Sequence, residues 1–311
     1  MRKIILELLY QNFLKRLKKS ILSYEEIEEP VKKEYVKEIN QQKIEQLKFQ
    51  KEILEFEQFL RERIPEEYRS EFYHNINRVN ITSFETCKKR TKILPLADYD
   101  PLKIIIRYQE KELGEAVYHE LFHLSASSIA GNKEKISFYG GLSQIIATEK
   151  GKKHIGKLLD EGYTELLALR HFNNKNSIGS YFMEVCFAKC IEDIIGKEKM
   201  YQYYFSSNIK GLIDELTQYN SRENILDFLV KEELLSAMLR LPKYFDDSKI
   251  TKCFHELTCF CLDSYQKKLE LAFQKGELTK EEIHYKQLEF AVLWFPADLT
   301  IENICKLVKE P

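Results

Sequence analysis

The spacing of apolar residues predicts that the chain begins with helices. In residues 1–20 the apolar positions recur every three or four residues, and lysine and arginine gather towards the other side. We interpret this stretch as an amphipathic helix packed on the protein rather than a signal peptide, with contact to a membrane surface as the alternative. Residues 24–72 remain charged and helical in pattern, broken at Pro30 and Pro65. We therefore expect an N-terminal helical segment over residues 1–72.

Candidate strands follow this segment. The composition shifts at Tyr73 towards β-branched and aromatic residues, in three stretches separated by turn residues. They are INRVNITSF (76–84), TKILPL (91–96) and PLKIIIRYQ (101–109). We interpret them as strands of a small sheet. The third stretch is also a candidate edge strand that could bind an extended peptide by β-augmentation.

Helical periodicity returns after the third candidate strand. Residues 110–128 combine helix-forming residues with apolar positions at helical spacing, and we expect this helix to stop by Gly131. The sequence then predicts a hairpin that turns near Gly151. A second helix is predicted over residues 160–172, with Asp160 placed to cap its start.

The remainder of the chain, after Ser177, has the pattern of packed helices. Taken together, the segments predict a mostly helical α+β fold. We expect three parts: an N-terminal helical segment (1–72), a core with the small sheet (73–176) and a C-terminal helical segment (177–311).

The charge and the cysteine content argue against several classes of protein. Lys and Arg total 48 and Asp and Glu total 49, so the chain lacks the basic surplus of a nucleic-acid-binding protein. Seven cysteines without a CxxC pair argue against a disulfide framework. No apolar run approaches the roughly 20 residues that span a bilayer, so we expect no transmembrane segment. We expect a soluble cytoplasmic protein, and the abundance of Lys, Ile, Tyr and Phe is typical of bacteria with AT-rich genomes.

A metal-binding motif lies within the helix predicted over residues 110–128. YHELFHLSA places His119 and His123 four residues apart, so both side chains lie on one helix face and can bind the same Zn²⁺. Glu120 lies about 100° further round the helix, beside the metal. There it could take a proton from zinc-bound water, whose pKa zinc lowers to about 7, and pass it to the leaving amine. We therefore identify Glu120 as the candidate general base.

A catalytic zinc usually has three protein ligands, so a third ligand is expected. The extended motif HExxHxxGxxH is absent, because Ala126 and Ile129 occupy its glycine and third-histidine positions. Downstream, LLDEGYTELLALR carries Asp160, Glu161 and Glu165 on the second predicted helix. Glu161 and Glu165 are four residues apart, so one could bind the metal while the other accepts a hydrogen bond from a ligand histidine.

These motifs carry a resemblance to a known family. HELFH followed by LDEGYTELL resembles the gluzincin branch of HExxH metallopeptidases, which includes thermolysin and the zinc aminopeptidases. GGLSQ, IGKLLDEGYTELLALRHF and YFMEVCFAKCIEDIIGKEKM look more closely like a little-characterised group of bacterial gluzincin-like proteins. The resemblance covers roughly residues 101–216 and implies a zincin-like catalytic core built around the HExxH helix.

The resemblance also implies the residues of the site. Its motifs place one zinc ion on His119, His123 and Glu161, and the general base on Glu120. The acid four residues after the ligand glutamate, which orients a histidine in thermolysin-like enzymes, falls on Glu165.

One residue departs from the family pattern, and the motifs do not identify the residue that stabilises the oxyanion. Asp160 replaces the usual Asn before the ligand glutamate, and the extra negative charge near the zinc could alter zinc affinity or make Asp160 a competing ligand. Gluzincins commonly supply a Tyr or His that stabilises the oxyanion. The candidates are Tyr139, His154, Tyr163, His171 and Tyr181. HELTC (255–259) imitates half of the zinc motif, but its spacing fits no zinc finger, and we interpret it as part of an ordinary helix.

The leading hypothesis is a soluble zinc peptidase that hydrolyses a peptide or protein substrate. The alternative is a gluzincin-fold binding or regulatory protein without catalytic turnover, in which zinc is structural or absent. The presence of Glu120 favours the peptidase over the binding protein, because a protein that needs only the metal or the fold does not require a general base at that position. A narrow-specificity processing peptidase or a toxin-like effector fits the same residues.

Overall fold

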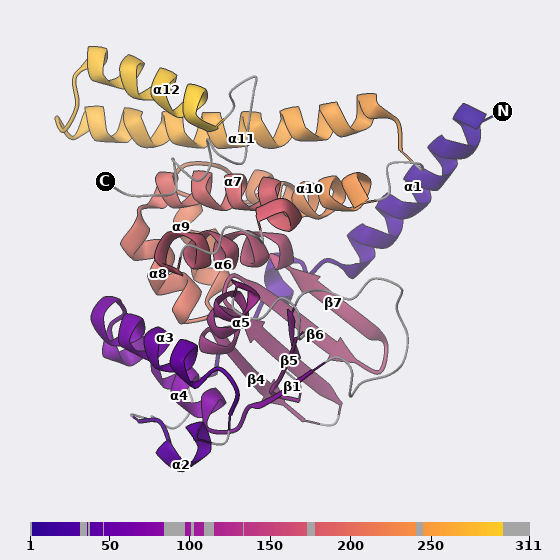
Figure 1. Ribbon diagram of the computed structural model, residues 1–311. Helices are drawn as coiled ribbons and strands as arrows, with labels where there is room; N and C mark the ends of the chain where they lie inside the picture. Colours follow the sequence, from indigo (N-terminus) through magenta and orange to yellow (C-terminus); the bar gives the residue numbers. More distant parts are fainter. Residues whose placement is uncertain are drawn as a thin grey trace.

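The computed structural model describes residues 2–31, 36, 38–45, 47–83, 97–100, 103–108, 115–132, 134–172, 178–240 and 245–294. Within these residues the protein is mostly helical with two small sheets (Figure 1), which confirms the predicted mostly helical α+β class. The HExxH motif lies on α5 (Glu115–Ser125). The helices before it are α1 (Arg2–Ser20), α2 (Gln41–Ile44), α3 (Gln50–Arg63) and α4 (Ser70–Ile76). The helices after it are α6 (Lys157–Phe172), α7 (Ile178–Ile195), α8 (Lys197–Phe205), α9 (Ile209–Leu216), α10 (Arg222–Arg240), α11 (Asp247–Gln274) and α12 (Lys280–Trp294).

The first sheet has three short strands in the order β1-β3-β2. The middle strand, β3 (Ile105–Tyr108), runs parallel to β1 (Asn80–Ser83) and antiparallel to β2 (Ala97–Asp100). The prediction that this stretch offers a free edge to a peptide is therefore wrong, because strands pair with both of its edges. The predicted strand at 91–96 lies outside the described residues.

The second sheet is an antiparallel meander in the order β4-β5-β6-β7. Its strands are β4 (Ser127–Gly131), β5 (Lys135–Gly140), β6 (Ser143–Thr148) and β7 (Gly151–Ile155). Thr148 pairs with Gly151 across the tight turn between β6 and β7, which confirms the hairpin predicted there.

The junction between α5 and β4 differs from the prediction. The helix ends at Ser125 rather than near Gly131, because residues 127–131 pair with β5 and so take an extended conformation. The buried Asn75 amide of α4 donates hydrogen bonds to the carbonyl oxygens of Leu124 and Ser127, both at 2.8 Å. The first bond satisfies a carbonyl group that the end of the helix leaves without an intrahelical partner, and the second holds the first residue of β4. The sheet therefore begins immediately after the motif helix.

The motif helix occupies the interior of the molecule, beneath α6 (Figure 1). Leu121, Phe122 and Leu124 of α5 are fully buried, and Phe122 contacts Phe56 of α3 edge to face. These residues belong to one hydrophobic core that reaches from the N-terminal helices to α11 and α12. Burial of such apolar surface is the main favourable term in folding, so the motif helix is anchored on most of its circumference.

α6 and α7 pack along each other at a close approach. A Cβ atom at Gly162 of α6 would lie 2.2 Å from the carbonyl oxygen of Glu184 of α7, so only glycine fits there. Arg170 of α6 and Glu192 of α7 form a buried two-point ion pair at 2.7 and 2.9 Å, and the Tyr163 hydroxyl donates to the same carboxylate. α7 therefore fixes the position of α6.

The N-terminal helix packs on the rest of the protein, as predicted. α1 lies beside α10 and β7 (Figure 1), and its Phe13 contacts Phe245 edge to face. The segment after α1 then continues across the second sheet, where the Leu22 amide donates to the His154 carbonyl and the Glu28 amide to the Gln144 side chain. No helix among the described residues is long and apolar enough to cross a membrane.

Candidate metal centre

α5 presents both motif histidines to α6. Because α-helical residues four apart lie one above the other, His119 and His123 share the side of α5 that faces α6, while the apolar residues cover the other sides. His119 is buried, with 5% of its surface exposed, and the His123 side chain is 16% exposed. The local sequence thus produces two neighbouring imidazole rings inside the protein.

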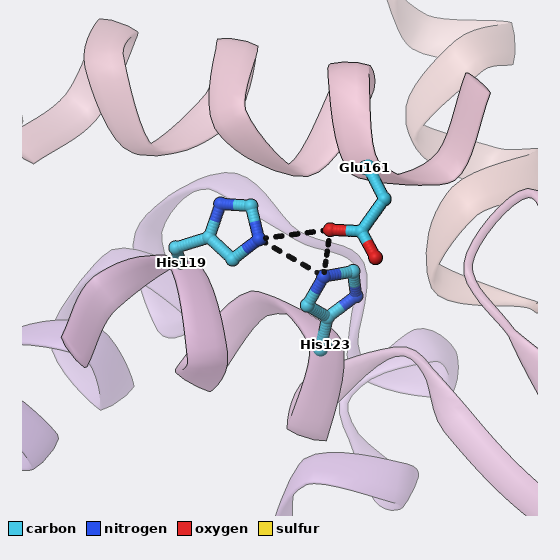
Figure 2. A group of neighbouring side chains, drawn as sticks. All are labelled: His119, His123 and Glu161. Carbon is cyan, nitrogen blue, oxygen red and sulfur yellow. Dashed lines mark hydrogen bonds and ion pairs between the residues drawn. The ribbon is translucent and has the colours of Figure 1, made fainter. Parts of the chain in front are cut away.

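Glu161 of α6 completes a group of three candidate ligands (Figure 2). One of its carboxylate oxygens, Oε2, lies 3.3 Å from Nε2 of His119 and 3.3 Å from Nε2 of His123. The two Nε2 atoms are 3.0 Å apart. The structure therefore brings together the three residues that the sequence proposed as ligands.

The spacing of these three atoms suits a tetrahedral metal ion. Zinc bonds of about 2.1 Å at tetrahedral angles place neighbouring ligand atoms about 3.4 Å apart. The separations of 3.0, 3.3 and 3.3 Å are close to that edge length. Two imidazole nitrogens and one carboxylate oxygen are also the donor set found in one class of catalytic zinc site.

Glu165, one turn after Glu161, contacts the far side of His119. Its Oε2 lies 2.8 Å from Nδ1 of His119, and its side chain is fully buried. In a neutral, metal-binding His119 this hydrogen bond would place the proton on Nδ1 and leave the lone pair on Nε2, which faces Glu161. The structure therefore places Glu165 where the sequence expected a carboxylate that orients a histidine.

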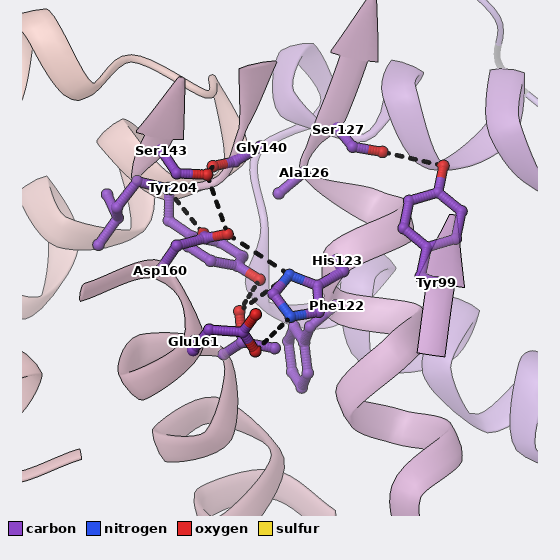
Figure 3. Close-up of polar contacts among 12 residues, drawn as sticks. Tyr99, Phe122, His123, Ala126, Ser127, Gly140, Ser143, Asp160, Glu161 and Tyr204 are labelled. Carbon is purple, nitrogen blue, oxygen red and sulfur yellow. Dashed lines mark hydrogen bonds and ion pairs between the residues drawn. The ribbon is translucent and has the colours of Figure 1, made fainter. Parts of the chain in front are cut away.

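Asp160 does not have the role that the sequence predicted. α6 begins at Lys157, so Asp160 lies in its first turn rather than at the capping position that precedes the helix, and the prediction of a capping residue is wrong. Its Oδ1 instead accepts a hydrogen bond from the Leu142 amide at 2.8 Å, and its Oδ2 lies 3.5 Å from Nδ1 of His123 (Figure 3). Asp160 is also outside the group of three ligand atoms, so it does not compete for the metal in this arrangement.

The contacts between α5 and α6 follow two parallel rows of residues. Glu161 and Glu165, four apart on α6, both contact His119. Asp160 and Thr164, also four apart, both approach Nδ1 of His123 at 3.5 Å. Sequence reasoning identified the first row and missed the second, although the i, i+4 spacing of Asp160 and Thr164 is visible in DEGYTE.

The electrostatics of the centre favour positive charge at the histidines. Burial alone would lower the pKa of His119, but hydrogen bonds with Glu161 and Glu165 outweigh it and raise that pKa to about 9. The pKa of His123 is raised well above its ordinary value because Glu161 and Asp160 outweigh its burial. Burial opposes ionisation of Glu161, yet the two histidines hold its pKa well below the ordinary range. The same carboxylates would stabilise a bound dication.

Two further residues matter here: Glu120, which follows His119 on α5, and Tyr181 of α7. Glu120 is buried, with 6% of its surface exposed. The Tyr181 ring stacks on the His119 ring, with centroids 5.6 Å apart and planes inclined by 12°. Burial raises the pKa of Tyr181, and the charges of Glu161 and Glu120 raise it further. Tyr181 has non-helical φ and ψ of −128° and 24°, so α7 is kinked at this residue.

The other four oxyanion candidates contact residues elsewhere. Tyr139 of β5 donates to Glu28 in the segment after α1, and Tyr163 donates to Glu192 between α6 and α7. His154 pairs with Glu233, and His171 contacts Tyr201. HELTC (255–259) lies within α11, as the sequence predicted for an ordinary helix.

Comparison with known proteins adds no assignment. No protein-family model, curated protein or solved structure matches the chain. The resemblance to gluzincins, including the zincin-like core, therefore stays a prediction that rests on the sequence motifs.

Proposed function

We propose that the protein is a zinc-dependent peptidase of the gluzincin type. The observation that carries the proposal is the triangle of Nε2 of His119, Nε2 of His123 and Oε2 of Glu161, whose edges of 3.0 to 3.3 Å suit one zinc ion. Glu120 follows His119 on α5 and is buried, so it is our candidate for the carboxylate that acts beside the ion. The two histidines and Glu161 would hold the ion. When bound, zinc would lower the pKa of a coordinated water and polarise the substrate carbonyl.

Glu120 has the role of general base. Its carboxylate accepts a proton from the attacking water as the water oxygen bonds to the scissile carbonyl carbon. It then donates that proton to the amide nitrogen, so that the C–N bond breaks and a neutral amine leaves. A carboxylate is suited to both steps because it is regenerated at the end of the cycle.

Tyr181 has the role of hydrogen-bond donor to the substrate. Its ring stacks on the His119 ring, and its raised pKa keeps the hydroxyl protonated at neutral pH. It can therefore donate to the carbonyl oxygen of the substrate as negative charge develops there. Stacking on His119 holds the ring in that position.

Peptide cleavage by matched variants tests the proposal. The zinc-loaded wild type should cleave members of a diverse peptide library, and Glu120→Gln, which keeps the shape of the side chain, should bind zinc and cleave none. Glu198→Gln is the matched control, because Glu198 is exposed on α8, and it should cleave as the wild type does. If the wild type binds zinc and leaves every peptide intact, the proposal is wrong and a binding or regulatory protein is the better account.

A further inference from the structure

The second sheet has an apolar face that the protein leaves partly exposed. Its opposite face is buried, although that face is the more polar of the two and carries Ser128, Ser137, Tyr139 and Gln144. An antiparallel sheet with one solvated face usually has its apolar side chains on the buried side and polar ones outside. Here the partly exposed side chains of β4, β5 and β6 on the open face are Ile129, Ile136, Phe138, Ile145 and Ala147.

Strand register places these five side chains in two adjacent rows. Ile129, Phe138 and Ile145 are direct partners across β4, β5 and β6. Ile136 and Ala147 are direct partners in the neighbouring row. Residues directly opposite each other project on the same face of a sheet, so the rows form one continuous apolar surface, which we call the sheet patch. None of the five belongs to the hydrophobic core of the described residues or packs against it.

Basic side chains border the sheet patch at its β7 end, and we call them the basic edge. Lys152 pairs with Ala147 and so continues the second row, while Lys150 lies in the turn between β6 and β7. The chain reaches this end of the sheet from α1 (Figure 1), because Ile21, which follows the last turn of α1, pairs with His154 of β7. Six exposed side chains make up the basic edge, and none forms an ion pair with another described residue: Lys15, Arg16, Lys18, Lys19, Lys150 and Lys152.

Positive charge is concentrated at this edge although the whole chain is nearly neutral. Residues 13–21 contain four basic residues and no acidic residue, and Glu149 is the only acidic residue in 148–155. Lys153, the remaining lysine of β7, forms an ion pair with Glu26 and is not part of the basic edge. The net charge of the chain is −1, so the basic edge is a local positive surface that attracts anions.

We propose that the sheet patch and the basic edge together bind the surface of an anionic membrane. The apolar side chains enter the boundary between headgroups and acyl chains, and the lysines contact the lipid phosphates. Each Lys or Arg held near an anionic leaflet strengthens binding about fivefold. A protein partner fits this surface less well, because lysine is depleted in protein interfaces, and a nucleic acid would not need the apolar rows. The inference does not rest on the zinc site.

Sedimentation of the full chain with lipid vesicles tests the charge. The wild type should bind vesicles made of phosphatidylcholine and phosphatidylglycerol in equal parts, and not vesicles of phosphatidylcholine alone. Salt at about 1 M should weaken this binding strongly, because it screens exposed charges. The double variant Lys150→Gln/Lys152→Gln should bind about 25-fold more weakly, since it loses two cations that each contribute about fivefold. Lys275→Gln/Lys280→Gln is the matched control, because both lysines are exposed beside the α11–α12 turn, and it should bind as the wild type does.

Ile136→Ser tests the apolar part of the surface. Ile136 is 36% exposed, so the substitution should leave the fold intact, as a circular dichroism melt can verify. Binding to the mixed vesicles should weaken about five- to tenfold, because the side chain no longer leaves water when the membrane binds. Leu288→Ser is the matched control, since Leu288 is 53% exposed on α12, and its binding should equal that of the wild type.

The outcomes distinguish a membrane from other partners. If the wild type binds neither kind of vesicle, or if the sheet variants bind as well as their controls, the proposal is wrong. In that case, a dimer that Ile136→Ser converts to a monomer would assign the sheet patch to a second copy of the chain. Binding to duplex DNA that Ile136→Ser leaves unchanged would instead assign the basic edge to a nucleic acid. Selective binding to the anionic vesicles, weakened in both sheet variants and retained in both controls, supports the proposal whether or not the protein cleaves peptides.

Discussion

Oε2 of Glu165 lies 2.8 Å from Nδ1 of His119, while Glu161, one turn earlier on α6, lies 3.3 Å from the other ring nitrogen. The His119 ring is therefore held between two carboxylates of one helix. Because the ligand nitrogen of a metal-bound histidine is set by the hydrogen bond at the opposite nitrogen, the two glutamates have different roles. Glu161 faces the position that a metal would occupy, and Glu165 faces away from it.

The first prediction concerns these two glutamates. Glu161→Ala removes a ligand and should lose zinc far more readily than Glu165→Ala, which should weaken zinc binding about 10- to 100-fold. Chelator competition on both variants measures the difference, and circular dichroism checks that each is folded. Equal losses, or a greater loss for Glu165→Ala, would show that the ligand is assigned to the wrong residue.

The second prediction concerns Tyr181. Tyr181→Phe keeps the ring stacked on His119 but removes the hydroxyl, so kcat for a cleaved peptide should fall about 100- to 1,000-fold while zinc affinity is retained. Tyr139→Phe is the control, since that hydroxyl contacts Glu28 in the segment after α1, and its kcat should equal that of the wild type. A wild-type kcat for Tyr181→Phe would exclude this tyrosine from the reaction.

The third prediction concerns the buried ion pair between α6 and α7. Burial alone would raise the pKa of Glu192, but the hydrogen bonds and charge of Arg170 outweigh it and lower that pKa below its ordinary value. A carboxyl group with a lowered folded-state pKa stabilises the fold fully above its unfolded pKa of about 4.3, and loses that contribution as the pH falls through the folded value. The ion pair should therefore stabilise the protein at neutral pH and weaken in acid.

Glu192→Gln measures this contribution. It leaves the buried Arg170 without its charged partner, and should lower the free energy of unfolding by about 3 to 5 kcal/mol at pH 7. The difference from the wild type should shrink from about pH 5 towards pH 3. Urea unfolding across that range is the measurement, with the exposed Glu198→Gln as control. If the difference in the free energy of unfolding between the wild type and Glu192→Gln stays constant with pH, the stabilisation does not come from the ionised Glu192.

The fourth prediction concerns the β5–β6 turn. Gly141→Ala forces a left-handed φ on alanine and places its Cβ 2.0 Å from Oδ1 of Asp160, so it should destabilise the protein by about 1 to 3 kcal/mol and weaken zinc binding. Gly276→Ala is the control, because Gly276 has φ of +76° and no atom within 4 Å of the added Cβ. It should cost stability without changing zinc affinity. Equal zinc affinity in Gly141→Ala and Gly276→Ala would show that the β5–β6 turn does not influence zinc binding.

The parts of the site that depend on one helix could be predicted from the sequence. Four-residue spacing places His119 above His123 and Glu161 above Glu165 whatever the rest of the fold does. The mostly helical class and the hairpin at Gly151 likewise follow from local periodicity and turn residues.

The parts of the fold and the site that depend on tertiary contacts could not be predicted from the sequence. The end of α5 at Ser125 is set by pairing of β4 with β5, which competes with helix extension over residues that suit either structure. Asp160 lacks its predicted capping role because the chain becomes helical three residues earlier, at Lys157. Its actual partners, Leu142 and His123, lie on other elements of the fold. Only their folded positions reveal that role.

The central claim is that His119, His123 and Glu161 hold one zinc ion. Anomalous X-ray scattering measured at the zinc absorption edge, on crystals of the zinc-loaded protein, tests it most directly. The account predicts a single strong peak about 2.1 Å from Nε2 of His119, Nε2 of His123 and Oε2 of Glu161. The absence of a peak there, or a peak elsewhere, for example beside His255 and Cys259 on α11, would contradict it.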